Sequence, residues 1–257
     1  MFLSLDAGNS NIVISFFDPL SREWTREFRL ETRANLSEAE LNQRIGLYLL
    51  ENEIRVDAIT RIGISSVVPE VNRTLESFSR NFLRKEPYLI SGRSYERLPI
   101  RTEKPDEIGS DLMCNVMAAY TRYQSACVVV DFGTALTFTV VSASGEVLGV
   151  NIVPGIKTAL KSLFTNTAKL PEVRLEVPAS AIGRDTVHSI QAGVIYGYVG
   201  LVNGMLDAIF DELGSATPVI GTGGLSHLLP KLEHRFDHID RRLTVEGIRL
   251  ITEANNT

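Results

Sequence analysis

The chain has 257 residues, of which 44% are hydrophobic and 22% are charged, a composition typical of soluble globular proteins. At this length it folds as one large domain or two of ordinary size, and folding buries roughly 70–75% of the unfolded surface. The formal net charge of −5 argues against nucleic acid as a partner, because nucleic acid favours a basic face. A phosphate-bearing ligand is still compatible, since a helix N-terminus or a lysine binds phosphate inside an acidic protein.

Targeting signals and membrane-spanning segments are not recognisable in the sequence. Asp6 interrupts the first apolar run, so no signal-peptide pattern precedes it, and no stretch of 18 apolar residues follows. Cys114 and Cys127 lie in apolar surroundings without a paired spacing, as buried reduced thiols do. We therefore expect a cytoplasmic protein with no membrane partner.

Apolar runs and amphipathic stretches alternate along the first half of the chain, which predicts both strands and helices. Ser37 is expected to cap one helix, and Pro69 to begin another. Residues 98–108 are polar and form a connector or a lid, whose Arg101 and Lys104 face solvent or, as the alternative, close over an anionic substrate. In chain order we expect strands at 2–5, 12–17 and 22–32, a helix at 37–52, a strand at 59–68, a helix at 69–85, a strand at 87–91 and a helix at 109–123.

The second half opens with the same pattern as the first. Each half begins with a strand, an Asp-x-Gly turn and two further strands, which indicates a duplicated α/β unit. In chain order we expect strands at 127–133, 136–143 and 147–153, helices at about 156–165 and 185–213, a strand at 218–224 and a helix after it.

Four glycines lie on one face of the predicted helix 185–213, namely Gly193, Gly197, Gly200 and Gly204. Each glycine inside a helix costs roughly 0.5–1 kcal/mol relative to alanine, so the stripe needs compensation. Close packing against another backbone would supply it, and this is the interpretation we favour. A nucleotide that approaches this face is the alternative.

The turn DAGNSN, residues 6–11, combines a carboxylate with groups that donate hydrogen bonds. Gly8 lets the chain turn without a Cβ atom, and Asn9, Ser10 and Asn11 add amide and hydroxyl donors to the exposed backbone N–H groups. Such a concavity suits a phosphate, and the carboxylate of Asp6 suits Mg²⁺ held through water. In isolation, the same residues are also those of an ordinary hairpin turn.

A second turn of this kind favours the phosphate interpretation. The sequence VDFGTALTFT places Asp131, Gly133 and Thr134 after a run of valines. Two such turns that face one cleft would offer two acidic cation sites and two sets of phosphate donors. Phosphoryl transfer requires this equipment, because it depends on positioning and on neutralising charge.

The duplicated Asp-x-Gly turn resembles that of the actin, Hsp70 and sugar-kinase superfamily, whose two ribonuclease H-like halves bind ATP between them. The chain resembles the type III pantothenate kinases more closely, and this resemblance extends from Asp6 to Gly224. The motifs that carry it, in the same order, are DAGNSN (6–11), ISSVVPEVN (64–72), IGSD (108–111), VVDFGTALTF (129–138), NIVPGI (151–156), LP (170–171) and GRDTVHSIQAGVIYG (183–197).

The resemblance implies a fold, an activity and roles for particular residues. The fold is α/β, with two duplicated ribonuclease H-like (actin-like ATPase) halves that have mixed sheets flanked by helices. Residues 1–117 form the half with the ATP phosphate loop, and residues 118–257 form the half with the cation site and the interface of a homodimer. The activity is ATP-dependent phosphorylation of the primary hydroxyl of pantothenate to 4'-phosphopantothenate, the first step of coenzyme A biosynthesis.

The roles of single residues follow from their positions in the family motifs. Asp111 is the catalytic base, Asp6 holds Mg²⁺ through water, and Asp131 binds a monovalent cation, K⁺ or NH₄⁺. The ATP-binding residues are Asp6, Ala7, Gly8, Asn9, Ser10, Asn11, Gly133 and Thr134, and the pantothenate-binding residues are Gly109, Ser110, Asp111, Leu112 and Thr186.

Asp111 also has a structural interpretation. It follows Gly109-Ser110 at the start of a predicted helix, where a carboxylate caps N–H groups and gains from the helix dipole. Without the resemblance, an N-cap is the expected role. With it, the catalytic role is favoured, and a capping geometry would help to keep the carboxylate ionised.

Two positions depart from the family pattern, both on the acceptor side. Leu112 stands where the pattern has an arginine, and Thr102 stands where it has a tyrosine three residues before Pro105. Leucine cannot make the forked contacts of arginine to a carboxylate. The departures leave two rivals open: a kinase of another hydroxyl acceptor, and a nucleotide-binding regulatory homologue without turnover.

Two smaller motifs have weaker interpretations. The sequence HRFDH, residues 234–238, has a zinc-like histidine spacing but no further ligands nearby, so we expect a solvated helix surface. The sequence GTGG, residues 221–224, is either a flexible turn or an approach to the nucleotide base or ribose.

Overall fold

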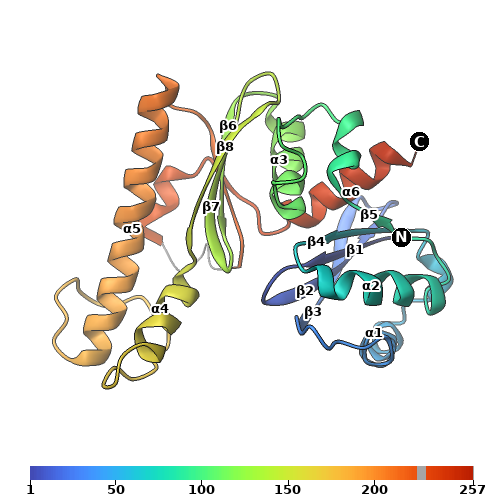
Figure 1. Cartoon of the computed structure of the whole chain (residues 1–257), viewed down its shortest axis with the longest axis horizontal. Coiled ribbons are helices and arrows are strands. Elements are labelled where there is room, and N and C mark those ends of the chain that lie inside the picture. The colour runs from blue at the N-terminus through green and yellow to red at the C-terminus, as the bar shows by residue number, and fades with distance from the viewer. Residues whose placement is uncertain (225–229, 257) are drawn as a thin grey trace. The chain divides into compact units, whose positions relative to one another are not determined.

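The computed structural model describes residues 1–224 and 230–256, and the chain divides into two compact units (Figure 1). Unit 1 comprises Met1–Arg122 and Arg242–Thr257, and unit 2 comprises Tyr123–Arg241. The division expected from the resemblance lies between residues 117 and 118, whereas the two compact units divide after Arg122 and again before Arg242. The first helix after the connector lies in unit 1 up to Arg122, and the C-terminal segment belongs to unit 1 because its last helix packs on that unit's sheet.

Unit 1 is built on a five-stranded mixed sheet in the order β3-β2-β1-β4-β5. The strands β1, β2 and β3 form an antiparallel meander, whereas β4 and β5 run parallel to β1. All five were predicted, because apolar runs between turn formers are local signals. Their bounds are β1 Phe2–Ala7, β2 Asn11–Asp18, β3 Glu23–Glu31, β4 Arg61–Ser66 and β5 Tyr88–Leu89.

Two helices, α1 (Glu38–Glu51) and α2 (Pro69–Asn81), cover one face of this sheet and share its apolar core. The start of each helix was predicted correctly: the Ser37 side chain accepts the N–H of Glu40, and Pro69 occupies the first turn of α2. The 3-10 helices η1 (Val56–Ala58) and η2 (Gly92–Arg97) precede β4 and follow β5. The polar segment after η2 leads into α3 (Ser110–Tyr123).

The helix α6 (Leu243–Asn255) was not predicted as part of this unit, yet it packs on β1 and β4. Two glycines allow this close approach. A Cβ at Gly63 of β4 would overlap the side chains of Thr252 and Ile248, and a Cβ at Gly247 would overlap the backbone of Cys114 in α3. The glycines therefore let α6 pack closely against both β4 and the backbone of α3.

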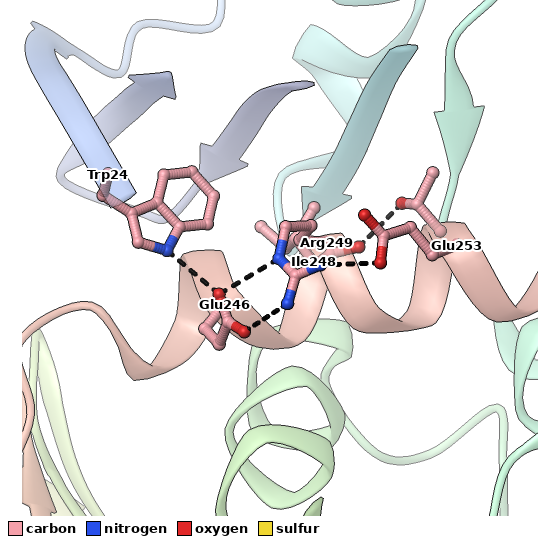
Figure 2. Close-up of polar contacts among 6 residues, drawn as sticks. Trp24, Glu246, Ile248, Arg249 and Glu253 are labelled. Carbon is pink, nitrogen blue, oxygen red and sulfur yellow. Dashed lines mark hydrogen bonds and ion pairs between the residues drawn. The ribbon is translucent and has the colours of Figure 1, made fainter. Parts of the chain in front are cut away.

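Two side chains of α6, Glu246 and Arg249, contact strands of the sheet, and ion pairs within α6 hold them in place (Figure 2). The Trp24 indole donates to Glu246 Oε2 at 3.0 Å, and the Arg249 guanidinium bonds to Glu246 and Glu253 at 2.6 Å each. The same guanidinium lies 4.5 Å from the centre of the Phe17 ring. The Arg249 side chain is only 15% exposed, whereas its partners Glu246 and Glu253 are 27% and 39% exposed.

Unit 2 repeats the sheet of unit 1, with the order β10-β9-β6-β7-β8. Again three strands form an antiparallel meander, and two more run parallel to the first of them. The expected duplication of ribonuclease H-like halves is thus confirmed. The strands are β6 Cys127–Phe132, β7 Ala135–Val141, β8 Val147–Pro154, β9 Val219–Thr222 and β10 His238–Ile239.

Helices α4 (Ile156–Thr165) and α5 (Thr186–Leu213) share an apolar core with one face of the second sheet. The helix expected after β9 falls on residues 225–229, outside the described residues, and the 3-10 helix η4 (Pro230–Arg235) comes next. His234 and His238 lie in η4 and β10, both exposed, so HRFDH is not one helix surface.

The glycine stripe of α5 does not pack as expected. A Cβ added at Gly193, Gly197, Gly200 or Gly204 would meet no atom within 4 Å, so no backbone of the described chain lies against this face. Among the described residues, α5 is also the one helix whose length and composition would allow it to cross a membrane. This is weak support for such a role, because a core helix passes the same test, and the opposite face of α5 packs on the sheet.

The contacts of Arg249 lead to a prediction about stability. Arg249→Met should lower the free energy of unfolding by about 1–3 kcal/mol, because it removes a largely buried guanidinium that bonds to two carboxylates and contacts the Phe17 ring. The matched change Arg80→Met removes an ion pair between side chains that are 46% and 71% exposed, and should have little effect. Urea unfolding of both variants compares the two. Equal effects would contradict a structural role for the α6 contacts.

Candidate functional site

The first acidic turn leaves β1 at the edge where β1 lies between β2 and β4. Asp6 is paired in register with Val13 on one side and Ser65 on the other. The turn is closed by the Gly8 N–H, which donates to the Asn11 carbonyl at 3.0 Å, as in the hairpin interpretation. Thr32 then fastens the turn to the residue after β3, because its hydroxyl donates to the Gly8 carbonyl at 2.6 Å.

The other residues of this turn differ in their exposure to solvent. Ala7 is buried, whereas Asn9, Ser10 and Asn11 are exposed. Gly8 has no positive φ, and an added Cβ would only make an ordinary contact of 3.5 Å with the Asn11 carbonyl. The fold itself therefore does not require glycine at position 8.

The start of α3 is bonded to the end of β4, next to Asp6. The Ser110 hydroxyl lies 2.8 Å from the Ser65 hydroxyl and accepts the Ser66 N–H at 3.1 Å. Since Ser65 is the register partner of Asp6, these contacts bring Asp111 to the same edge of the sheet. The structure thus places the predicted base and the predicted ATP-side carboxylate in one region of unit 1.

Burial dominates the electrostatics of Asp111. It raises the pKa of the carboxyl above its usual value, and the Leu112 N–H, which donates to Oδ1 at 2.8 Å, opposes this only in part. The carboxylate folds back over Gly109, where an added Cβ would lie 2.5 Å from Oδ1. The expected capping of helix N–H groups by Asp111 is therefore limited to the bond from the adjacent Leu112 N–H. Glycine at position 109 leaves room for the carboxylate.

Cys114 shows that the two acids influence the same point. Burial raises the pKa of its thiol, and the negative charges of Asp6 and Asp111 raise it further. The Ser65 hydroxyl contacts the same thiol. Cys114 is hence a buried thiol, as expected, and it lies on α3, where both carboxylates act on it.

Two buried hydroxyls flank Asp131 in unit 2. Asp131 on β6 pairs in register with Thr137 on β7 and Thr222 on β9. The two threonines are 7% and 1% exposed, and neither hydroxyl has a hydrogen-bond partner among the described residues. Gly223, with φ 89°, passes so close to Asp131 that a Cβ would lie 2.5 Å from its Oδ1 atom. Within the GTGG motif, Gly221 and Thr222 therefore belong to β9, and glycine is required at position 223 by its φ and by the carboxylate beside it.

The turn after Asp131 is held by the start of α4. The Gly155 N–H donates to the Thr134 carbonyl at 2.9 Å, and the Thr158 hydroxyl donates to the same oxygen at 2.7 Å. A Cβ at Gly155 would overlap the Gly133 and Thr134 carbonyl oxygens. The NIVPGI motif thus serves to press α4 against the Gly133–Thr134 turn, where the Thr134 side chain is exposed.

The predicted acceptor residues are distributed over both units. Leu112 is buried in unit 1, so its side chain fills space. Thr186 begins α5 in unit 2 and is exposed, next to the helix cap Asp185. Lys104 pairs with Glu107 at 3.0 Å, both 68% exposed, which supports a solvated connector.

Sequence reasoning overlooked Ser65, Thr137 and Thr222. Single serines and threonines in a strand carry no recognisable signal. Their importance follows from strand register, which places them beside Asp6 and Asp131 on neighbouring strands. No group of three or more His, Cys, Asp and Glu side chains that could hold a metal occurs among the described residues. A cation at either aspartate would therefore need hydroxyl, carbonyl, water or phosphate oxygens as further ligands.

A family model for type III pantothenate kinase matches residues 2–208. The chain belongs to this family. It is 38% identical to the type III pantothenate kinase of Myxococcus xanthus, over 100% of this chain and 99% of the relative. The resemblance stated from the sequence motifs is confirmed.

Solved structures agree with the fold of this type III pantothenate kinase family member. A conserved Campylobacter jejuni protein classed with Baf family transcriptional activators has a TM-score of 0.58 at 22% identity, covering 99% of this chain and 98% of that one. A Sinorhizobium meliloti protein classed as a 2-dehydro-3-deoxygalactonokinase has a TM-score of 0.61 at 11% identity, covering 99% and 96%. At these identities the two structures support the fold alone.

The raised pKa of Asp111 predicts a pH-dependent gain of stability in Asp111→Asn. A group whose folded pKa exceeds its unfolded value makes stability fall as pH rises through that interval. At pH 7 the variant should therefore unfold at higher urea concentration than the wild type, because a buried charge is removed while the carbonyl can still accept the Leu112 N–H. The gain should shrink as pH falls towards about 4, near the usual pKa of aspartate. A variant less stable at pH 7 would contradict the prediction.

Proposed function

We propose that the chain transfers the γ-phosphoryl group of ATP to the primary hydroxyl of pantothenate, the first step of coenzyme A biosynthesis. The observation that carries the proposal is the juxtaposition in unit 1 of Asp6, at the first acidic turn, with Asp111, at the start of α3. Family membership supports the activity, since relatives that match over their full length are named type III pantothenate kinases.

In this proposal the first acidic turn binds the ATP phosphates. The exposed residues Asn9, Ser10 and Asn11, together with Gly8, which has no side chain, suit phosphate oxygens. Mg²⁺ would be held by Asp6 through water, because a lone carboxylate fits an ion that keeps several waters and shares phosphate oxygens. Gly133 and the exposed Thr134 are the corresponding nucleotide contacts in unit 2.

Asp111 acts as the base in the transfer step. The oxygen of the acceptor hydroxyl forms a bond to the γ-phosphorus, the bond from that phosphorus to the bridging oxygen breaks, and ADP leaves. The hydroxyl proton passes to the Asp111 carboxylate. We assign it to Oδ2, because Oδ1 accepts the Leu112 N–H. A pKa raised by burial makes this carboxylate a better proton acceptor, provided that it is ionised at the working pH.

Asp131 is proposed to hold a monovalent cation, K⁺ or NH₄⁺. The residues fit, because two buried hydroxyls without partners flank this carboxylate in register and a weakly hydrated cation takes oxygen ligands. Such a cation, when bound, supplies positive charge that compensates the nucleotide phosphates. Thr137 and Thr222 are the chain's own contribution beside Asp131.

The acceptor side differs from the family pattern, and this affects affinity in the proposal. Leu112 is packed and cannot pair with a carboxylate, so the acceptor is held without the arginine contact. We expect the KM for pantothenate to be high as a result. Thr186 is the proposed pantothenate contact in unit 2.

We further propose that the protein is a cytoplasmic homodimer that needs neither nucleic acid nor a membrane. The glycine face of α5 supports a second copy, because it contacts nothing within 4 Å in the described chain although glycines in a helix need compensation by packing. A monomeric mass in sedimentation experiments would contradict the dimer.

The decisive experiment compares wild type and Asp111→Asn in an assay of ADP release with ATP, Mg²⁺, K⁺ and pantothenate. The wild type should release ADP only when pantothenate is present, and the variant should lose at least ~100-fold in kcat, because the base is removed. ATP binding, measured by calorimetry, should be unchanged. Turnover with other hydroxy acids but not with pantothenate would redirect the proposal to another acceptor, and ATP binding without any turnover would favour a regulatory role.

The cation proposal predicts a specific loss in Thr222→Val. This change keeps the shape of the side chain but removes a hydroxyl beside Asp131, so the K⁺ concentration that gives half-maximal activity should rise several-fold. The control Thr139→Val alters a buried threonine on β7 two positions beyond Thr137, and should leave that concentration unchanged. A K⁺-independent enzyme would refute the assignment.

A further inference from the structure

Two buried serine hydroxyls join the end of β4 to the start of α3. Ser65 is fully buried and Ser110 is 8% exposed. Their hydroxyl oxygens are 2.8 Å apart, and Ser110 also accepts the Ser66 N–H at 3.1 Å and donates towards the Ser66 carbonyl at 3.3 Å. Ser65 additionally contacts the thiol of Cys114, one turn into α3. The two side chains thus form a continuous polar connection between strand and helix.

This connection matters because of its neighbours. Ser65 is the register partner of Asp6, and Ser110 directly precedes Asp111. The hydrogen bonds that hold the Asp111 carboxylate come from backbone N–H groups of the same helix end. The position of the carboxylate relative to Asp6 therefore depends on how the first turn of α3 is fixed to β4.

We propose that Ser65 and Ser110 are positioning residues for the phosphoryl transfer, and that together they set the distance between the base Asp111 and the phosphate turn at Asp6. This rests on the proposed function. Ser110 then acts through its contact with β4 and not through the acceptor, although the family resemblance places it among the acceptor-binding residues. The hydroxyl is turned to Ser65 and Ser66, which leaves it no free proton for a ligand.

Alanine cannot replace this connection. With Ser110→Ala the Ser66 N–H and the Ser65 hydroxyl lose a partner in a buried place, so the first turn of α3 shifts to restore their bonds. A displacement of a reacting group by about 1 Å can cost as much as 100-fold in rate. Threonine at position 110 keeps the hydroxyl and is the conservative variant.

The test measures kcat, KM and pH profiles for Ser110→Ala, Ser65→Ala, the double variant and Ser110→Thr. We expect each alanine variant to lose about 10- to 100-fold in kcat with unchanged KM for ATP, and the double variant to lose no more than a single one, because the residues act as a unit. Ser110→Thr should recover most of the rate. The control is Ser79→Ala, which removes an equally buried serine hydroxyl, bonded within α2 at 2.8 Å, and should keep the wild-type kcat.

Several results would overturn the inference: a wild-type kcat in Ser110→Ala, additive losses in the double variant, or a similar loss in Ser79→Ala. Failure of the proposed function is distinguishable, because the wild type itself would then release no ADP with pantothenate. In that case a double-mutant cycle between Ser110→Ala and Asp111→Asn in urea unfolding tests the same connection without turnover. Coupling between the two changes would support positioning, and strict additivity would refute it.

Discussion

The first strand of each unit pairs with a parallel neighbour, β1 with β4 and β6 with β9. The register of these two pairs determines which residues lie beside Asp6 and Asp131. In unit 1 this pairing sets Asp6 beside Ser65, and in unit 2 it sets Asp131 beside Thr222. A shift of one residue would turn the carboxylates to the opposite, apolar face of each sheet. The valine and leucine residues that alternate with the acids are buried in the cores of the two units, so the hydrophobic effect itself enforces the register.

Equivalent strand registers give the two acids different hydrogen-bonding neighbours in the two units. Ser65 is committed to Ser110, so the first acid is linked to a helix that carries a second carboxylate. The threonines beside Asp131 have no such helix bonded to them, and their hydroxyls stay without partners among the described residues. The duplicated scaffold thus gives its two acids different surroundings, through the residues that neighbouring strands contribute, and the roles proposed for Asp111 and Asp131 rest on this difference.

Most of the fold could be predicted from the sequence because its signals are local. The two hairpins, the Ser37 cap and the Pro69 helix start each depend on a few consecutive residues. What escaped prediction depends on distant partners. The packing of α6 on unit 1 requires Gly63 and Gly247 to meet chain segments far away in sequence, and the roles of Ser65, Thr137 and Thr222 exist only once the strands are aligned. The motif residues Asp6, Asp111 and Asp131 were recognisable, whereas the groups that hold them were not.

The return of α6 to the first sheet also has a consequence for biosynthesis. When the ribosome has delivered residues 1–122, the face of β1 and β4 that α6 covers, with Gly63 and Cys114, still lacks its helix. Unit 2 is synthesised completely before α6 leaves the exit tunnel, so its sheet can close first. The first unit to begin translation is therefore completed only after unit 2, and its apolar face stays uncovered until α6 has been synthesised.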